Sequence, residues 1–416
     1  MYRIVNQVPV SRYVSNLLTA ISAQLYYDRG KMTSSTTYES GYVDKLMQAN
    51  TTSKFYMEYM DYRSNHLTHG LVALDRLRAP KARLDQFVEW YQKRLEKPDG
   101  KAAKDQAADL ESDPERLLGS RKGYYTLVKH YTAKLKNDYA SDVNLLIQRE
   151  LPKLHRGMIG AAAHGLIQTG YGYAGKSDTA VCEGLAYIHH SFMPITLKDE
   201  SLHLGKGDTD ILDVMTNLRN DRTLQDYIRS KEVTDLSDDR ISNITGPLVK
   251  NKGNALAEYV SQIKTPEFDT SNCSMEQVKE ICQWFLDCVI LVYTKSERKN
   301  DFFLLHGVTA TWSLLQLLDA LDDALQALKI IQSLVISVMA IYLAQGSPPL
   351  TLPINAVRYN EWKDIIQAVH DRKELDEHVL KLVQVVHDLS VDNSDAEKAL
   401  LYKAAANSVL TNDFVF

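Results

Sequence analysis

An all-α fold, organised as a single large multi-helical domain, is what the sequence predicts. Along most of the 416 residues, apolar side chains recur at every third or fourth position, as they do on the buried face of a helix. Alternating runs of four or more residues, which predict half-buried strands, are scarce. No repeat of fixed period is present, so we expect one domain over residues 1–416.

In the first half of the chain the helical pattern covers residues 43–59, 61–74, 80–96 and 124–171. Pro80 suits the start of a helix because the first turn does not need its missing N–H. Residues 97–122 are charged and poor in large apolar side chains, which predicts a loop-rich excursion on the surface.

The second half begins with residues 198–270, which carry many charges and few core candidates, so short helices and long loops are expected there. Strong helices are predicted at residues 275–293, 302–321, 324–344, 361–370, 374–388 and 394–410. The most apolar run, residues 325–344, is interrupted by polar side chains below the roughly 18 residues that a membrane span needs. We therefore interpret it as a helix in the core of the protein.

Composition excludes several classes of partner. The net charge is -5 and charged residues make up 24% of the chain, so no large basic surface for nucleic acid or a membrane is expected. The four cysteines show no metal-binding or disulfide spacing, which indicates buried thiols in a reducing, cytoplasmic setting: Cys182, Cys273, Cys282 and Cys288. The first 27 residues contain arginines and no acid, which fits either a mitochondrial transit peptide or an ordinary amphipathic helix.

The histidines of the predicted helices are the candidates for chemistry. His66 and His69 are three residues apart, a step that turns a helix by about 300° and puts both imidazoles on one face. In most such pairs one ring contacts a neighbour and the other faces water. The pair alone therefore indicates a binding face without establishing one.

His164 follows a run of small residues at positions 160–163, which lets a neighbouring helix or a flat ligand approach the backbone. A histidine there is either a packed core residue that donates to a carbonyl or a ligand. His306 is surrounded by large apolar residues, where a buried imidazole is costly unless both ring nitrogens find partners, and a metal ion is one such partner. His378 and Lys381 share a helix face with valines and leucines, although a lysine in that position usually extends to water.

Four segments resemble the questin oxidase-like family, whose best-known members act on fungal aromatic polyketides such as anthraquinones. They are NHLTHGLVALDRLRAP, RGMIGAAAHGLIQTGYG, LLHGVTATWSLL and DEHVLKLV, in this order and at these distances, over roughly residues 65–383. The resemblance implies an all-helical oxygenase with one non-haem iron, buried between helices. It also implies that four histidines and a lysine carboxylated by CO2 hold the metal.

If the ligand set of the family applies to this chain, the ligands would be one histidine of the His66 and His69 pair, together with His164, His306, His378 and Lys381. We favour His69 as the ligand and His66 as a donor that supports it. The predicted catalytic residues are His69, His164 and Lys381. Two positions differ from the fungal pattern, since Arg78 replaces a usual glycine and Gln168 a frequent second histidine, and these differences concern the substrate.

Coordination chemistry agrees with this ligand set. Ferrous iron, Fe(II), accepts imidazoles and usually takes an anionic oxygen ligand as well, which a lysine carbamate supplies. Burial favours the neutral amine that reacts with CO2. Five ligands leave one octahedral position for O2 as co-substrate. The predicted reaction inserts oxygen into, or cleaves, a ring of a polycyclic aromatic or quinone-like substrate, with a Baeyer–Villiger-like or dioxygenase outcome.

Four further side chains are expected to support the site or line the substrate pocket: Glu183, Gln168, Tyr171 and Trp312. Glu183 either holds a ligand histidine in its tautomer or has a surface or helix-terminal role. His189 and His190 point about 100° apart on a helix, so both cannot easily join one site. The remaining histidines are assigned to structure or surface: His130, His155, His203, His370 and His387.

Three alternatives stay open at this point. The HD dipeptides at 370–371 and 387–388 suggest an HD-type metal-dependent phosphohydrolase. A non-catalytic helical interaction protein would use its histidines for packing alone. A two-metal oxygenase would use Glu183 as a bridge. No GxGxxG motif follows a predicted strand, so the sequence contains no motif that supports NADPH as a reductant.

Overall fold

The computed structural model describes residues 41–415 except for 61–62, 98–112, 231–239, 271, 355–357, 359–360 and 392. Residues 39–416 form one compact unit. The described residues contain sixteen α-helices and a single pair of two-residue strands, which confirms the predicted all-α class. The prediction of one domain from residue 1, the interpretations of the N-terminal segment and most of the predicted 97–122 excursion lie outside the described residues.

Up to residue 190 the elements are α2 (Tyr42–Ala49), β1 (Glu58–Tyr59), β2 (Arg63–Ser64), α3 (Leu67–Arg76), α4 (Lys81–Gln92), α6 (Tyr124–Asn137), α7 (Val143–Leu154), α8 (His164–Ala174) and α9 (Asp178–His190). Single 3-10 turns lie at Pro114–Leu117, His155–Gly157 and Gly160–Ala163. The helix predicted at 43–59 is wrong beyond residue 49. Met57 and Tyr59 are buried on alternate positions, which is strand periodicity, and Glu58 pairs with Ser64 in an antiparallel hairpin.

Beyond residue 190 the helices are α10 (Ile211–Asn220), α11 (Arg222–Arg229), α13 (Arg240–Gln262), α14 (Met275–Lys295), α15 (Phe302–Leu317), α16 (Ala324–Ala344), α17 (Trp362–Asp371), α18 (Glu377–Ser390) and α19 (Ala396–Thr411), with a 3-10 turn at Leu318–Ala320. The expectation of only short helices within 198–270 is wrong, because α13 has 23 residues. Its buried positions, including Leu248, Leu256 and Val260, recur at helical spacing and pack on α16.

Side-chain caps explain where most of these helices begin. Aspartates accept N–H groups of the first turn at the starts of α7, α10, α11, α15, α16, α18 and α19. Ser274 and Gln277 form a reciprocal capping box at α14. Each aspartate satisfies N–H groups that no helical carbonyl can reach, so the caps fix the helix starts.

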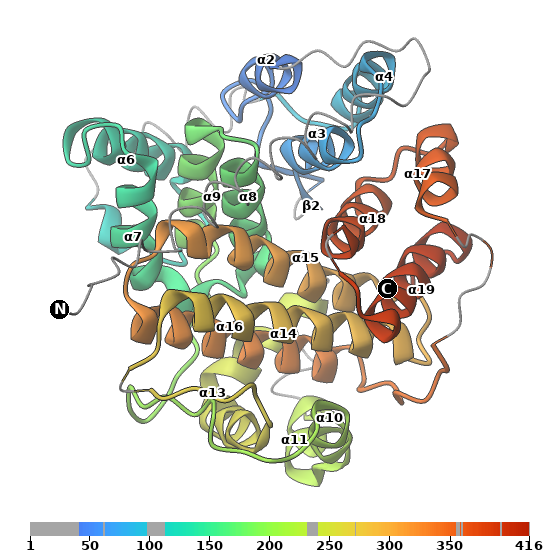
Figure 1. Ribbon diagram of the computed structural model, residues 1–416. Coiled ribbons are helices and arrows are strands. Elements are labelled where there is room, and N and C mark those ends of the chain that lie inside the picture. The colour runs from blue at the N-terminus through green and yellow to red at the C-terminus, as the bar shows by residue number, and fades with distance from the viewer. Residues whose placement is uncertain are drawn as a thin grey trace, which may run out of the picture. The chain divides into compact units, whose positions relative to one another are not determined.

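Four helices pack against each other in a closed ring, in the order α3, α8, α15, α18 and back to α3. Figure 1 shows α15 beside α16 and α14, which pack on its other sides. The apolar α16 is long enough to span a membrane, but almost all of it is buried inside the protein, as the sequence predicted. The faces of α15 that pack on α14 and α16 are therefore closed to solvent.

Glycines let α8 approach its neighbours closely. A Cβ at Gly170 would lie 2.5 Å from the Ser313 Cα atom on α15. A Cβ at Gly165 would lie 2.5 Å from the backbone nitrogen of Ile188 on α9. Since real Cβ atoms do not approach a backbone this closely, both contacts depend on glycine.

We predict that Gly170→Ala lowers the free energy of unfolding by about 1–3 kcal/mol, because the added methyl group pushes α8 away from the α15 backbone. Gly246→Ala, a glycine change inside α13, is the matched control. Its Cβ would meet only the flexible end of the Met193 side chain. Urea unfolding of both variants measures the difference. Equal stability of Gly170→Ala and the wild type would contradict the close contact.

Candidate metal centre

The ring of four helices brings four histidines together. His66 directly precedes α3, His164 begins α8, His306 lies in α15 and His378 lies in α18. One ring nitrogen from each lies within 4.8 Å of the others, and all four side chains are buried. Ligands on opposite sides of an ion at about 2.1 Å stand roughly 4.2 Å apart, so the group has the dimensions of a metal site.

An oxygen atom holds the Nδ1 atom of each ring. His66 Nδ1 lies 3.1 Å from Glu377 Oε1, and His378 Nδ1 lies 3.0 Å from Asp376 Oδ1. His306 Nδ1 donates to the Phe302 carbonyl at 2.7 Å, and His164 Nδ1 donates to the Ala161 carbonyl. Because these oxygens accept hydrogen bonds, a neutral ring held in this way carries its proton on Nδ1 and has a bare lone pair on Nε2.

The Nε2 atoms have no protein partner suited to them. The Nε2 atoms of His164 and His306 are 3.1 Å apart, and with both protons on Nδ1 neither atom can donate to the other. Within the described residues, the buried Nε2 atoms of His66 and His378 have no hydrogen-bond partner. Buried ring nitrogens without a donor are costly, and a cation bound between the four rings would give them a partner.

Burial keeps three of the four rings neutral, those of His66, His164 and His306. It lowers the pKa of His164 to about 3 and lowers the pKa values of His66 and His306 well below the ordinary range, and nearby positive charge adds to the effect. A metal ion binds only the unprotonated nitrogen of an imidazole. These three rings are therefore in the protonation state that binds a cation.

Lys381 faces the same group from one turn further along α18. Its side chain is fully buried, and its Nζ atom has no hydrogen-bond partner among the described residues. Burial lowers its pKa to about 8, although Glu377 and Asp376 oppose the fall. Its charge in turn lowers the pKa values of His66, His164 and His306. A lysine amine placed in this way needs a partner that the described side chains do not supply.

His69 lies beside the four-nitrogen group and is not one of its members. Its ring centroid is 5.0 Å from that of His66 and 5.1 Å from that of Tyr171. Neither of its ring nitrogens has a hydrogen-bond partner by distance and angle in the described part of the chain. The two histidines do not share a helix face, because α3 starts only after His66.

The carboxylates of Asp376 and Glu377 are functional candidates that the sequence reasoning did not name. Asp376 caps α18 through the His378 N–H and also holds the His378 ring. Glu377 lies 3.6 Å from the Arg94 guanidinium, and its burial raises its pKa. Their position next to His378 in the DEH tripeptide was the available signal, since a carboxylate that orients a ligand histidine often lies close to it.

A strained backbone precedes His164. Ala161, Ala162 and Ala163 have φ values of 50°, 53° and 63°, so three consecutive residues are left-handed. Such a residue costs roughly 1–2 kcal/mol when it is not glycine. This turn breaks the helix predicted over residues 124–171, and it brings the Ala161 carbonyl to the His164 ring.

The other predicted pocket residues lie beside the centre. Glu183 accepts hydrogen bonds from the Thr52 N–H and hydroxyl, both at 2.7 Å, and none of its described hydrogen bonds involves a histidine. Gln168 Nε2 is 3.5 Å from Glu183 and its amide also influences the pKa of His69. Tyr171 and Trp312 are fully buried, with ring centroids 4.6 Å apart.

The two HD dipeptides do not join a metal site in the described part of the chain. Asp388 accepts hydrogen bonds from Arg76 at 2.7 Å and Gln384 at 2.6 Å. His387 stacks edge-on against Trp362. The described groups of three or more potential ligands include neither dipeptide, which removes the main support for a phosphohydrolase.

Aromatic side chains reach the centre from the solvent side. The Phe302 ring is 4.5 Å from the His378 ring and 4.7 Å from the His306 ring, centroid to centroid. Phe414 lies 5.9 Å from His378 and 5.7 Å from Phe302, held there by backbone pairing between Val415 and residues 300–302. Phe302, Phe303 and Phe414 are all partly exposed, and we call these three residues the aromatic rim.

A family model described as questin oxidase-like matches residues 63–386. This range holds all four histidines of the group and Lys381, and it covers well over half of the chain. No curated protein matches the chain.

We predict that Glu183→Gln becomes more stable relative to the wild type as the pH rises. Burial raises the pKa of Glu183 to about 7, whereas an unfolded chain ionises near 4.5. Between these values folding takes up a proton, so the wild type loses stability with rising pH, by roughly 3 kcal/mol at pH 8. Gln removes this loss and still accepts the Thr52 hydrogen bonds.

Urea unfolding at pH 5 and pH 8 measures the effect, with Glu150→Gln as the control of opposite sign. Burial raises the pKa of Glu150, but hydrogen bonds from Tyr139, Lys153 and Lys134 outweigh it and keep the pKa low. Glu150→Gln should therefore lose stability relative to the wild type at pH 8. If the free energies of unfolding of Glu183→Gln and the wild type changed with pH in parallel, a neutral Glu183 would be refuted.

Proposed function

This chain belongs to the questin oxidase-like family, and from that premise we propose that it is a non-haem iron oxygenase that inserts oxygen into, or cleaves, a ring of a polycyclic aromatic or quinone-like molecule. Family membership implies an oxidoreductase. The observation that carries the proposal is the convergence of one ring nitrogen from each of four buried histidines, together with a buried lysine amine that has no hydrogen-bond partner among the described residues. A protein that used these histidines only for packing would leave their lone pairs unsatisfied.

The iron ligands we propose are His66, His164, His306, His378 and Lys381. Between His66 and His69 the geometry favours His66, because Glu377 holds its Nδ1 atom and one of its ring nitrogens belongs to the four-nitrogen group, which does not include His69. This choice reverses the preference drawn from the sequence. Ferrous iron bound there would supply the electrons that activate O2.

Lys381 contributes an anionic oxygen if its amine is carboxylated. The neutral Nζ attacks the carbon of CO2, an N–C bond forms, one C=O bond becomes a C–O single bond and one amine proton leaves to water. The low pKa of Lys381 provides the neutral amine near pH 8. Carboxylation would convert this buried, unpartnered amine into a group whose anionic oxygen could bind the iron.

The protein's own groups orient and hold the site. Glu377 and Asp376 fix the rings of His66 and His378, and the carbonyls of Phe302 and Ala161 fix the other two. His69, a buried ring next to His66 that the Gln168 amide contacts, is placed to accept and pass on a proton beside the reacting molecules. Burial of all these groups excludes water from the centre.

The aromatic rim is the substrate-binding surface that we propose. Aromatic rings stack offset or edge-on with centroids about 4.5–7 Å apart, so a flat polycyclic substrate fits against Phe302 and Phe414. Phe302 touches two ligand histidines, which puts a ring stacked on it next to the metal. Tyr171 and Trp312 are on the buried side and support His69 instead.

We place the enzyme in the cytoplasm, with a small aromatic molecule as its partner and the substrate or free NADPH as the source of any extra electrons. All four cysteines are free thiols, and burial raises the pKa of Cys182 to about 12. Three of them are buried, whereas Cys273 is partly exposed, in contrast to the sequence prediction. Unreactive thiols fit a reducing compartment.

We predict that anaerobically purified protein contains about one equivalent of iron, and that His164→Ala and Lys381→Met lose most of it. His155→Ala is the control, because His155 is buried against Ser333 outside the site and its loss should leave iron in place. In metal-free protein Lys381→Met should be at least as stable as the wild type, since it removes a buried amine. Metal analysis measures the iron content, and thermal unfolding measures the stability of the metal-free proteins. A wild-type protein without iron, or a full iron content in both site variants, would contradict the proposal.

We predict that Phe414→Ala weakens binding of a flat probe, 1,8-dihydroxyanthraquinone, about tenfold without changing the iron content, because roughly 1.4 kcal/mol of stacking is lost. Phe268→Ala is the matched control, since Phe268 packs against Gly205 away from the centre. Titration calorimetry on iron-loaded protein measures the affinities. Equal affinity of Phe414→Ala and the control would exclude the rim as the binding surface.

A further inference from the structure

Residues 412–415 follow α19 without helical structure, and we call them the strap. Three hydrogen bonds between described residues join the strap to the start of α15. Val415 N–H donates to the Asn300 carbonyl at 3.2 Å, and Phe302 N–H donates to the Val415 carbonyl at 2.9 Å. The Asn300 amide side chain donates to the Asn412 carbonyl at 2.8 Å. Since Val415 is 40% exposed, the strap runs along the surface of the protein.

The strap places an aromatic ring over the metal centre. The Phe414 ring lies 5.9 Å from the His378 ring and 5.7 Å from the Phe302 ring, centroid to centroid. Phe414 is half-buried, whereas His378 is only 6% exposed. Phe414 therefore stands between one of the four histidines and solvent.

Phe302 connects the strap to the centre. Its N–H donates to the strap, its carbonyl accepts the Nδ1–H of His306 at 2.7 Å, and its ring is 4.5 Å from that of His378. Movement of the strap would release this N–H from Val415 and uncover the Phe302 ring, whereas the carbonyl stays part of α15. The strap can therefore open without breaking the contact that holds His306.

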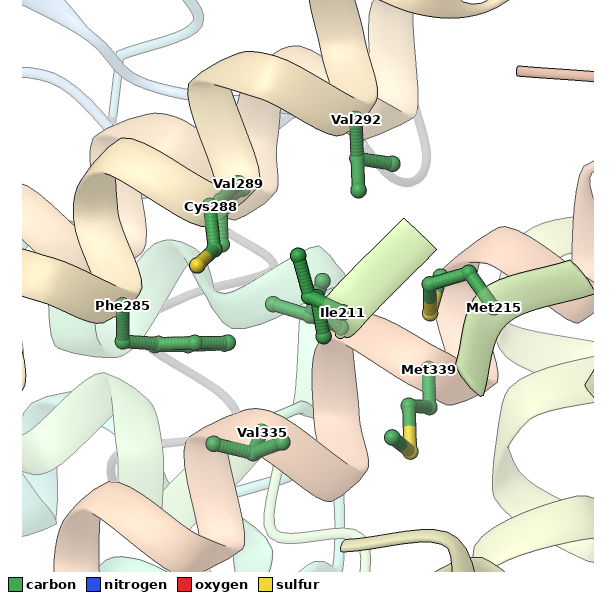
Figure 2. Close-up of a pocket in the computed structure, with 9 residues that line it drawn as sticks. Ile211, Met215, Phe285, Cys288, Val289, Val292, Val335 and Met339 are labelled. Atoms are coloured by element: carbon green, nitrogen blue, oxygen red, sulfur yellow. The ribbon is translucent and has the colours of Figure 1, made fainter. Parts of the chain in front are cut away.

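A polycyclic molecule needs an opening to reach the centre. The four histidines are at most 9% exposed, and α14 and α16 cover two faces of the helix that carries His306. The hollow between α10, α14 and α16 gives no route, because it has room for about one water molecule and the α15 backbone lies between it and the histidines (Figure 2). Parts of a protein with few buried contacts open at the lowest free energy, and the strap is such a part.

We propose that the strap is a lid over the metal centre, which opens to admit a flat aromatic molecule and closes with Phe414 against it. The lid itself stands on these contacts, whereas the kind of molecule that it admits rests on the proposed function. An open strap exposes the Phe302 ring as a stacking surface next to His306 and His378. A closed strap holds the bound molecule between Phe302 and Phe414 and keeps water out.

Hydrogen exchange of the full-length, iron-loaded protein without O2 tests whether the strap opens. The amides of Phe302 and Val415 should be protected to the same extent, and about tenfold less than the amide of Leu305. Leu305 is the internal control, because it lies in the same turn but donates to the Asp301 carbonyl at 3.1 Å and not to the strap. Equal protection of all three amides would show that the helix end opens as a whole, and would overturn the lid.

A bound flat molecule should keep the lid closed. With 1,8-dihydroxyanthraquinone as the probe, the protection of the Phe302 and Val415 amides should rise about tenfold, whereas that of Leu305 should stay the same. Titration calorimetry on the same sample shows independently whether the probe is bound.

Two variants loosen the strap in different ways. Val415→Pro removes the N–H that donates to Asn300. Asn300→Gly removes the side chain that donates to the strap and keeps a residue that suits the φ of 53°. Each variant should speed dissociation of the probe about tenfold in stopped-flow measurements, with an unchanged iron content. Asp413→Asn is the control, because it alters none of the three hydrogen bonds and should match the wild type.

The outcomes separate the lid from the oxygenase. A probe that binds without raising the protection of Phe302 and Val415, or that leaves both loosened variants at the wild-type rate, overturns the lid. A probe that does not bind overturns the assignment of the molecule that the lid admits. A protein that shows the expected exchange and dissociation but consumes no O2 refutes the oxygenase proposal and leaves the lid in place.

Discussion

The centre depends on one interaction repeated four times: an oxygen atom that accepts the Nδ1–H of a buried histidine. Two of these oxygens are backbone carbonyls, from Phe302 and Ala161, and two are carboxylates, from Glu377 and Asp376. Each contact fixes both the tautomer and the direction of its ring. Without them the Nε2 atoms would rotate away or become protonated, and the four-nitrogen group would not exist.

Keeping this arrangement has a cost that the rest of the fold must offset. Three left-handed alanines, a buried amine and a buried carboxyl at Glu377 are each unfavourable in a folded protein. The close glycine contacts of α8 and the caps of α15 and α18 hold these groups in place. Strain concentrated at one buried point, inside an otherwise regular helical fold, is typical of a functional site.

Much of the fold follows from local sequence, whereas the geometry of the centre follows from tertiary packing. The apolar periodicity of α14, α15 and α16 is strong enough to identify each helix. Spacing alone identified His164, His306, His378 and Lys381 only as candidates, because their convergence needs four helices far apart in sequence. The hairpin that moves His66 off its helix, and the left-handed turn before His164, depend on contacts that no periodicity encodes.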